Sequence, residues 1–379
     1  MFMATSLLPH HVRTRGSGDA STGLDMMQTR VKTTGRDRPF RPWPWRMALA
    51  VLLLLMTPLA AARAEPVSIT ATPIPLNVDK SEQAEIGRLR YLGGLELRAD
   101  SAHFGGFSGL LVSDDGRSLI ALSDRGSWLT AELVHDDDGR LIGMERADIA
   151  PARRPPGRAF DPEALMFRPR ENDLLITSER NHRLIAYELP QTRSRSTPYR
   201  YNAHELARFR PSVLEAPRDF ANLGKNEGIE ALVQLTDGRL FALEEGGENP
   251  ADTPARGWLI GSKDKVERLT LTRSVRFRPT DAALLPNGDV LVLERRYTAL
   301  GGVAARLRVL EQEALVAGAE LQGEVIAELV PPVSVDNMEG LAVRQDGNRT
   351  IVTLISDDNF NQWQRTILLQ FELRPERTR

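Results

Sequence analysis

The chain has 379 residues, 41% of them hydrophobic, which is enough to bury the core of one large domain or two ordinary ones. Residues 1–64 hold nine of the 49 Lys and Arg but only three of the 51 Asp and Glu, so the rest of the chain, with 40 basic and 48 acidic residues, has a net charge of −8. This balance argues against a nucleic-acid partner, and the absence of Cys excludes disulfides, lipidated thiols and thiolate catalysis.

The first 64 residues are typical of an N-terminal extension followed by an export signal. The basic segment 36–46 precedes the apolar run 47–62 and the small-x-small motif Ala62-Arg63-Ala64. No adjacent pair of arginines precedes the run, so we expect a Sec-type signal peptide cleaved after Ala64. In a bacterium the product is then periplasmic or secreted, without a stable membrane span. An uncleaved anchor is the alternative. We expect residues 65–85 to be a linker and residues 86–375 to be one domain.

Five related segments follow along the chain, and each has an apolar stretch, a turn and a second apolar stretch. They are residues 107–126, 162–181, 229–247, 281–297 and 338–359. Four of the turns are Asp-Gly or Asn-Gly pairs, which tolerate the positive φ angles of a tight hairpin. These turns are Asp115-Gly116, Asp237-Gly238, Asn287-Gly288 and Asp346-Gly347. Each segment is therefore predicted to form a β-hairpin.

Two more candidate strands follow the hairpins, for example residues 182–189 and 204–211, or 305–312 and 324–331. Four antiparallel strands repeated roughly every 50–65 residues predict a single all-β β-propeller of five blades. A sixth blade remains an alternative if residues 190–225 hold a degenerate one, as does a β-sandwich or β-helix. The last segment lacks a fourth strand, so we expect residues 87–97 to pair with 366–373 and close the ring.

The loop that enters the first strand of a blade lies on the same face as the loop that leaves the second, and both kinds are acidic here. The entering loops hold Asp161 and Glu163; Asn226, Glu227 and Glu230; Asp281; and Asp336, Asn337 and Glu339. The exit loops hold Asp124 and Arg125; Glu179 and Arg180; Glu244 and Glu245; Glu294, Arg295 and Arg296; and Asp357 and Asp358. We expect an acidic mouth that must share a positive charge, since unit charges ~4 Å apart repel by about 4 kcal/mol at an effective dielectric of ~20.

Carboxylate and amide oxygens, without Cys and with few His, suit calcium rather than zinc or copper. The residues predicted to hold the metal are Asp124, Glu179, Glu227, Glu244, Asp336, Asp357 and Asp358. Glu163, Glu230 and Glu339 occupy the same place in three repeats, where the other two have Ser108 and Ala282, and are predicted to be catalytic carboxylates facing one another. The arginines predicted to bind an anionic group are Arg125, Arg180, Arg295 and Arg296. A purely structural ring of ion pairs is the alternative.

A serine hydrolase at Ser108 is disfavoured, because residues 105–109 do not match Gly-x-Ser-x-Gly and lead into a strand rather than a helix.

Seven motifs together resemble the exported bacterial proteins described as having esterase-like activity of phytase, the phytase-like family. They are SDRG (123–126), DPEAL (161–165), SERN (178–181), NEGIEAL (226–232), LVLERRY (291–297), DNMEGL (336–341) and SDDNFNQ (356–362). The resemblance covers about residues 86–375 and implies a propeller that hydrolyses an ester or phosphoester. Calcium-dependent propeller phytases have six blades and Lys-rich phosphate sites, whereas Lys is scarce here, so phytate is not the substrate we expect.

We therefore expect a monomeric exported hydrolase in which calcium assists attack by water on a small anionic ester or phosphoester. The alternatives are a lactonase-like hydrolase of carboxylic esters and a non-catalytic propeller that binds a ligand at its mouth.

Overall fold

The computed structural model describes residues 67–157, 160–190, 197–224, 228–246, 253–261, 265–274, 276–299 and 301–375. The chain separates into two compact units, Met1–Ala61 and Ala62–Arg379, and every described residue belongs to the second. The predicted extension, signal peptide and cleavage after Ala64 lie outside the described residues. Within those ranges, no helix is long and apolar enough to cross a membrane.

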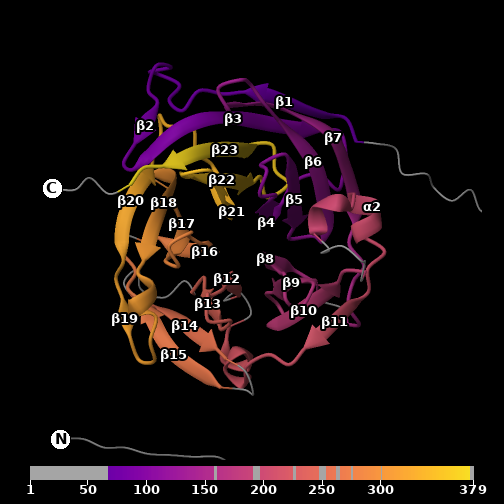
Figure 1. The fold of residues 1–379 in the computed structure, drawn as a ribbon, viewed down its shortest axis with the longest axis vertical. Coiled ribbons are helices and arrows are strands. Elements are labelled where there is room, and N and C mark those ends of the chain that lie inside the picture. Colours follow the sequence, from indigo (N-terminus) through magenta and orange to yellow (C-terminus); the bar gives the residue numbers. More distant parts are fainter. Residues whose placement is uncertain are drawn as a thin grey trace, which may run out of the picture. The chain divides into compact units, whose positions relative to one another are not determined.

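Five small sheets stand around a common axis and form a five-bladed β-propeller (Figure 1). Blade 1 contains β4 (Phe107–Val112), β5 (Ser118–Ser123), β6 (Ser127–His135) and β7 (Leu141–Pro151). Blade 2 contains β8 (Pro162–Arg168), β9 (Asp173–Ser178), β10 (Arg183–Glu188) and β11 (Pro211–Leu214). Blade 3 contains β12 (Ile229–Gln234), β13 (Leu240–Glu244), β14 (Ala255–Ile260), β15 (Val266–Leu271) and β19 (Glu320–Leu321). Blade 4 contains β16 (Arg278–Leu284), β17 (Val290–Thr298), β18 (Gly302–Leu310) and β20 (Glu324–Leu329). The predicted fold class and blade number are confirmed.

Blade 5 joins the two ends of the domain. It runs from β21 (Asn337–Asp346) through β22 (Arg349–Asp357) and β23 (Thr366–Leu373) to β3 (Leu89–Ala99). β3 pairs antiparallel with β23, with Leu95 opposite Leu368, so the predicted closure is confirmed. The segment expected to be a linker adds two more strands to this sheet. They are β1 (Ile69–Pro73) and β2 (Glu85–Ile86), which both pair with β3.

The described part of segment 190–225 does not form a blade, so the six-bladed alternative is wrong. It contains η1 (Pro198–Arg200), α2 (Ala203–Leu206), β11 and η2 (Arg218–Asn222). The strand expected at 204–211 is also wrong, since α2 covers its start and β11 begins at Pro211. A capping box explains the helix: the side chain of Asn202 accepts a hydrogen bond from Glu205 N, and the carboxylate of Glu205 accepts one from Asn202 N.

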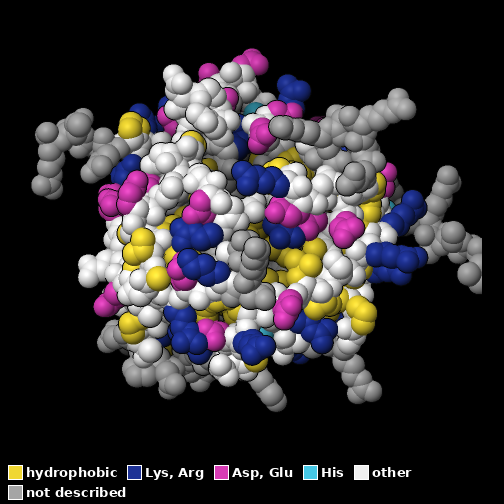
Figure 2. Space-filling model, turned by 60° about the horizontal axis from the view of Figure 1, so that its bottom comes forward, with side chains coloured by type: hydrophobic (Ala, Val, Ile, Leu, Met, Phe, Trp, Pro, Cys, Tyr) yellow, Lys and Arg dark blue, Asp and Glu magenta, His cyan; other side chains and the backbone are white. Residues whose placement is uncertain are grey.

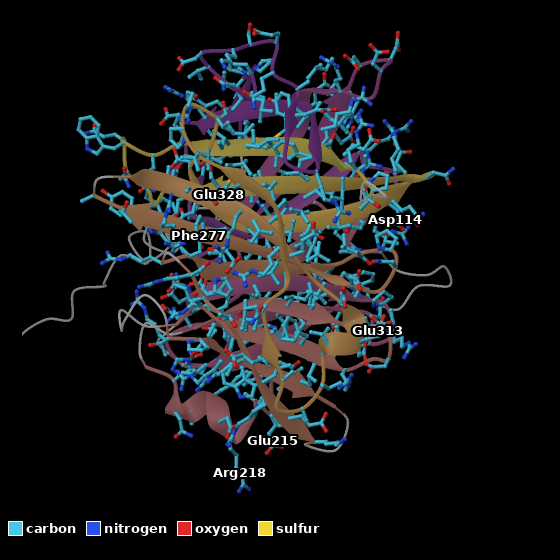
Figure 3. All side chains as sticks on the ribbon, turned by 90° about the vertical axis from the view of Figure 1, so that its left-hand side faces the viewer. Asp114, Glu215, Arg218, Phe277, Glu313 and Glu328 are labelled. Atoms are coloured by element: carbon cyan, nitrogen blue, oxygen red, sulfur yellow. The ribbon has the colours of Figure 1, made fainter. Side chains whose placement is uncertain are left out.

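The first strand of each blade lies nearest the axis, where β4, β8, β12, β16 and β21 contact their counterparts in the adjacent blades. Figure 3 shows Phe277, just before β16, and Asp114, in the hairpin turn after β4, toward opposite faces of the ring. We call the face of the entering loops the mouth face and the face of the hairpin turns the turn face. On the face drawn in Figure 2, basic and acidic side chains are interspersed rather than segregated.

Apolar side chains fill the wedges between neighbouring sheets. Trp128 of blade 1 meets Tyr187 of blade 2 edge to face, with ring centroids 5.5 Å apart. Between blades 2 and 3, Phe220 packs on Trp258 at 5.1 Å. Each is largely or completely buried. Burial of such a side chain contributes roughly 1.5–3 kcal/mol, so the stability of every blade depends on both of its neighbours.

Deletion of residues 365–379, which removes β23, should unfold the whole domain, because β22 and β3 then become two unpaired edges and the wedge between blades 4 and 5 loses Leu369 and Phe371. Far-ultraviolet circular dichroism during heating measures this. A chain ending at residue 375, which keeps β23 whole, is the control. A cooperative melt in the shorter chain would contradict the requirement for closure.

Candidate functional site

Every innermost strand carries a β-bulge at the same place. The register shifts lie between Phe107 and Gly109, Pro162 and Leu165, Ile229 and Ala231, Pro279 and Asp281, and Met338 and Gly340. The residues within these intervals are Ser108, Glu163 with Ala164, Glu230, Thr280 and Glu339. An extra residue in one strand redirects its side chain, and bulges are frequent beside active sites. Five equivalent positions thereby surround the axis.

Three of these positions bring carboxylates together. Glu163, Glu230 and Glu339 each place a carboxylate oxygen within 4.8 Å of the other two, and all three residues are buried. We call these residues the channel cluster. The structure thus brings together the three acids that the repeats placed at one position.

The fourth repeat differs from the expected alignment. Thr280, not Ala282, occupies the bulge of β16 and lies seven residues before the Asn-Gly turn, as Glu230 and Glu339 lie before their Asp-Gly turns. The hydroxyl of Thr280 donates a hydrogen bond to the carbonyl of Met338, 3.1 Å away, and so links blade 4 to blade 5. Asp281 follows it with a buried carboxylate that accepts hydrogen bonds from Ala282 N and Leu341 N. Its role is to join β16 to β21.

A second set of side chains comes from the end of the second strand in each blade. In each blade, the residue of the first strand just before the bulge pairs with a residue near the end of the second strand. These second-strand residues are Ser123, Ser178, Glu244, Glu294 and Ser356. The residues that follow them are Asp124, Glu179, Glu245, Arg295 and Asp357. We call these five the rim ring. Glu179 joins Asp161 and Glu163 in a further group whose carboxylate oxygens lie within 4.8 Å of one another.

Glu244, which the sequence predicts to be a metal ligand, is not part of the rim ring. Its carboxylate pairs with Arg256 on β14, with a nitrogen–oxygen distance of 2.6 Å, and accepts a hydrogen bond from Arg256 N. Glu245 faces the channel instead and lies 2.9 Å from Arg295. Successive side chains of a strand point to opposite faces, so a one-residue error changes the site.

Burial and mutual repulsion raise the pKa values of these acids. Burial, with the charges of Glu230 and Glu339, raises the pKa of Glu163 well above its usual range. Burial likewise raises the pKa of Glu230 and Glu339. In the rim ring, burial and the charge of Glu339 raise the pKa of Asp357 to about 8, and burial and the charge of Asp161 raise that of Glu179 to about 7. The site gains stability when a positive charge enters it.

Arg295 is a half-buried cation in contact with these acids, and Arg278 also reaches Glu245, at 3.5 Å. Its guanidinium lies 2.9 Å from Glu339 through Nε and 2.9 Å from Glu245 through Nη2. Burial alone would lower the pKa of Arg295, but the charges of Glu339 and Glu245 outweigh it and raise the pKa. Among the described residues, no hydrogen bond or ion pair reaches the carboxylates of Glu163 and Glu230. Within the channel cluster, the guanidinium of Arg295 therefore pairs with Glu339 alone.

The family model described as "Phytase-like: Esterase-like activity of phytase" matches residues 102–360. The chain belongs to the phytase-like family. Family and fold together support a hydrolase-type propeller. No curated protein matches this phytase-like chain.

Several solved structures are similar to the phytase-like chain at low identity. An α-L-arabinofuranosidase from Podospora anserina is 10% identical, covers 75% of this chain and 97% of its own, and has a TM-score of 0.44. The Cps50 (Swd1) β-propeller domain from Myceliophteria thermophila is 13% identical, covers 79% and 99%, and has a TM-score of 0.35. A protein of unknown function from Dyadobacter fermentans is 10% identical, covers 81% and 99%, and has a TM-score of 0.36.

The remaining predicted ligands of the phytase-like propeller have other partners. Asp336 accepts hydrogen bonds from Asn337 N and Arg365 N, so it orders the loops around β21. Asp358 accepts hydrogen bonds from Gly106 N, Phe360 N and the Thr366 hydroxyl. Some of these donors, Gly106 N and Arg365 N, come from segments far away in the sequence. Glu227 lies outside the described residues.

The four predicted arginines are not equivalent. Arg180 pairs with Asp161 at 2.6 Å, and Arg295 belongs to the rim ring. Arg296 lies over the ring of Phe277 and reaches Glu328 at 3.9 Å, which places it away from the channel cluster. Arg125 lies over the ring of Phe360, 3.5 Å from its centroid. The mouth therefore holds both paired and stacked guanidinium groups.

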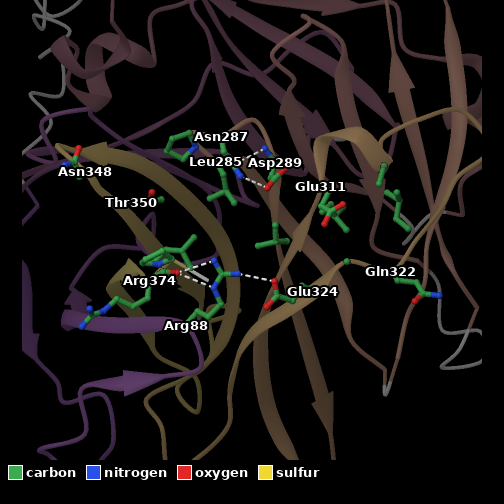
Figure 4. A pocket seen from close by; sticks show the side chains of 18 residues that line it. Arg88, Leu285, Asn287, Asp289, Glu311, Gln322, Glu324, Asn348, Thr350 and Arg374 are labelled. Atoms are coloured by element: carbon green, nitrogen blue, oxygen red, sulfur yellow. Dashed lines mark hydrogen bonds and ion pairs between the residues drawn. The ribbon is translucent and has the colours of Figure 1, made fainter. Parts of the chain in front are cut away.

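A cavity of about 880 Å³ on the turn face lies apart from these acids. Arg88, one of its lining residues, is held by Glu324 and by the carbonyl oxygen of Arg374 (Figure 4). The other lining residues include the turn residues Asn287 and Asn348. Neither the channel cluster nor the rim ring contributes to this cavity, so its size does not make it the candidate site.

The raised pKa values predict that the metal-free protein becomes less stable as pH rises from about 5 to 9. Asp357 and Glu179 hold protons in the folded state, with pKa values of about 8 and about 7, that the unfolded chain has already lost near pH 5. Thermal melts in chelator at a series of pH values measure the effect. In Asp357→Asn the decrease between pH 7 and 9 should be smaller. A melting temperature that rises over this range would contradict the assignment.

Proposed function

We propose that this phytase-like protein is a hydrolase in which calcium, held at the mouth, assists hydrolysis of an ester or phosphoester. The observation that carries the proposal is the convergence of the buried Glu163, Glu230 and Glu339 within 4.8 Å, where Arg295, through Glu339, is the one guanidinium among the described residues that pairs with them. We further propose that residues 86–375 act as a monomeric domain in the periplasm or outside the cell, after cleavage behind Ala64.

The donor set fits calcium. Glu163 and Glu230 offer oxygen atoms that no described residue engages, and the neighbouring Asp124 and Asp357 add further carboxylates. Calcium takes six to eight oxygen ligands in a flexible geometry, which a ring of independent side chains can supply. When bound, the ion would polarise the ester and favour ionisation of the attacking water.

The protein's own residues would do the remaining work. Glu179 has a pKa of about 7, raised mainly by burial, and it sits beside Asp161 and Glu163. A carboxylate with this pKa is suited to accept the proton of the attacking water near neutral pH. The oxygen of the water then bonds to the carbonyl carbon or the phosphorus, and the alcohol leaves with a proton. Arg295 would hold Glu339 and Glu245 in place through the whole cycle.

Calcium should stabilise the protein and Glu230 should be required for it. A ligand at about 100 times its dissociation constant stabilises the folded state by about 2.7 kcal/mol, which corresponds to roughly 4–8 °C in melting temperature. Thermal melts with calcium and with chelator measure the shift. In Glu230→Gln the shift should fall by more than half.

Glu230 is a cleaner target than Glu339, because neutralising Glu339 would also remove a partner of Arg295. The matched control is Glu244→Gln, which breaks the pair with Arg256 and should lower stability by roughly 1–3 kcal/mol while keeping the calcium shift. Equal melts with calcium and chelator in the native protein would favour the structural ring of ion pairs.

Hydrolysis should require calcium and the channel cluster. With a chromogenic phosphate ester and a chromogenic carboxylic ester as substrates, Glu230→Gln should reduce kcat/KM on the better substrate by at least ~100-fold. Turnover of the carboxylic ester alone would support the lactonase-like alternative. No turnover of either ester, with calcium bound, would support a non-catalytic binding propeller.

A further inference from the structure

Arg125 differs from the other predicted arginines in its partners. Its guanidinium lies 3.5 Å above the centroid of the Phe360 ring. The guanidinium groups of Arg180 and Arg295, by contrast, form ion pairs with carboxylates. Among the described residues, no hydrogen bond or ion pair of the Arg125 side chain is present, and the side chain is exposed. Stacking uses the face of the guanidinium and leaves the N–H groups on its edge available.

The ring beneath Arg125 is held in an unusual backbone conformation. Asn359 and Phe360 both have positive φ angles, 50° and 51°. For a bulky residue such as Phe this conformation is rare and costs energy, and it persists where the surroundings impose it. Asp357 accepts a hydrogen bond from Asn359 N at 2.6 Å, and Asp358 accepts one from Phe360 N at 2.9 Å. Two mouth carboxylates thus fix the position of the ring.

Gly106 leaves room for the Phe360 side chain to lie beside Asp124 of the rim ring. Gly106 has a φ of 65°, and a Cβ there would collide with both the Phe360 ring and the carboxylate of Asp124. Gly106 N also donates a hydrogen bond to Asp358 at 3.1 Å. The stacked pair of Arg125 and Phe360 is therefore built against Asp124, at the edge of the candidate site rather than on a remote surface.

We propose that Arg125, held flat by Phe360, is the receptor for an anionic group of the substrate. A planar guanidinium with free edge donors matches the two oxygens of a phosphoryl or carboxylate group. The substrate class that follows is an ester that carries such a group, with phosphomonoesters as its simplest members. This inference deepens the proposed function and rests on it for the location of the reacting bond. Phe360 is a positioning residue that acts through Arg125.

The acids nearest to this receptor determine when an anion can reach it. Asp124 precedes Arg125 in the chain, and Asp357 and Asp358 accept hydrogen bonds from the backbone N–H groups of Asn359 and Phe360. Their negative charges would repel an anion until a cation or protons neutralise them. Binding of the anion should therefore be tighter with calcium than without it.

Binding of phenylphosphonate, a phosphate ester analogue that is not hydrolysed, tests the proposal by isothermal titration calorimetry. In calcium, Arg125→Met should raise the dissociation constant at least 10-fold. Phe360→Leu should raise it about 3–10-fold, and Phe360→Tyr, which restores the ring, should return it to within about 2-fold of the native value. Arg268→Met is the matched control, since it removes an exposed positive charge that is already paired with Asp219, outside the rim ring and the channel cluster, and it should change the constant by less than 3-fold.

Three results would overturn the proposal: no binding of phenylphosphonate by the native protein in calcium, a change of less than 2-fold in Arg125→Met, or equal losses in Arg125→Met and Arg268→Met. Arg125 is exposed, so the fold should tolerate its replacement, and thermal melts check this. The same titrations in chelator separate the two proposals. A difference in the dissociation constant between calcium and chelator tests the proposed function. A difference between the native protein and Arg125→Met, in calcium or in chelator, tests the role of Arg125 as the receptor.

Discussion

The bulge in each innermost strand is the constraint on which the candidate site depends. Five strands crowd around one axis, and the residue after each bulge must be small or specially bonded for the strands to approach. A Cβ at Gly340 would lie 2.9 Å from Leu110 Cβ of the adjacent blade, which real structures avoid. Asp281 is the exception, and its carboxylate bonds across to Leu341 N. The preceding side chain is then directed to the axis, so the fold itself assembles three glutamates.

Such an assembly opposes folding when it carries no counterion. Buried carboxyl groups this close together cannot all be ionised. The negative charges of Glu163 and Glu230 must therefore be neutralised by protons or balanced by a cation. Arg295 supplies one positive charge to Glu339 and Glu245. The propeller holds the acids together, because apolar packing between its blades fixes the strands that carry them. This is the usual relation between a functional site and the scaffold that maintains its strain.

The architecture could be predicted from local signals, whereas parts of the site could not. Asp-Gly and Asn-Gly turns at a regular spacing indicated the blades, and the missing last strand indicated the closure. Glu163, Glu230 and Glu339 were found because their distance from the turns is nearly constant. Thr280 lies at the same distance from its turn as these glutamates. The acidic residue next to it, Asp281, made the fourth repeat look as if it carried an equivalent acid. The choice between Glu244 and Glu245 depends on the last paired residue of β13, which periodicity does not define. The hydrogen bonds of Asp336 and Asp358 depend on contacts between distant segments.

The closing blade also sets the order in which the chain can fold. β3 is synthesised early, whereas its partner β23 is the last of the described strands. Leu95 therefore cannot pair with Leu368 until nearly the whole domain has been synthesised. Contacts between residues so far apart in sequence form slowly, because the intervening chain must first be brought together. Until then β3 and β22 present open edges. The incomplete chain can therefore pair through these edges with another molecule until β23 fills the gap between them.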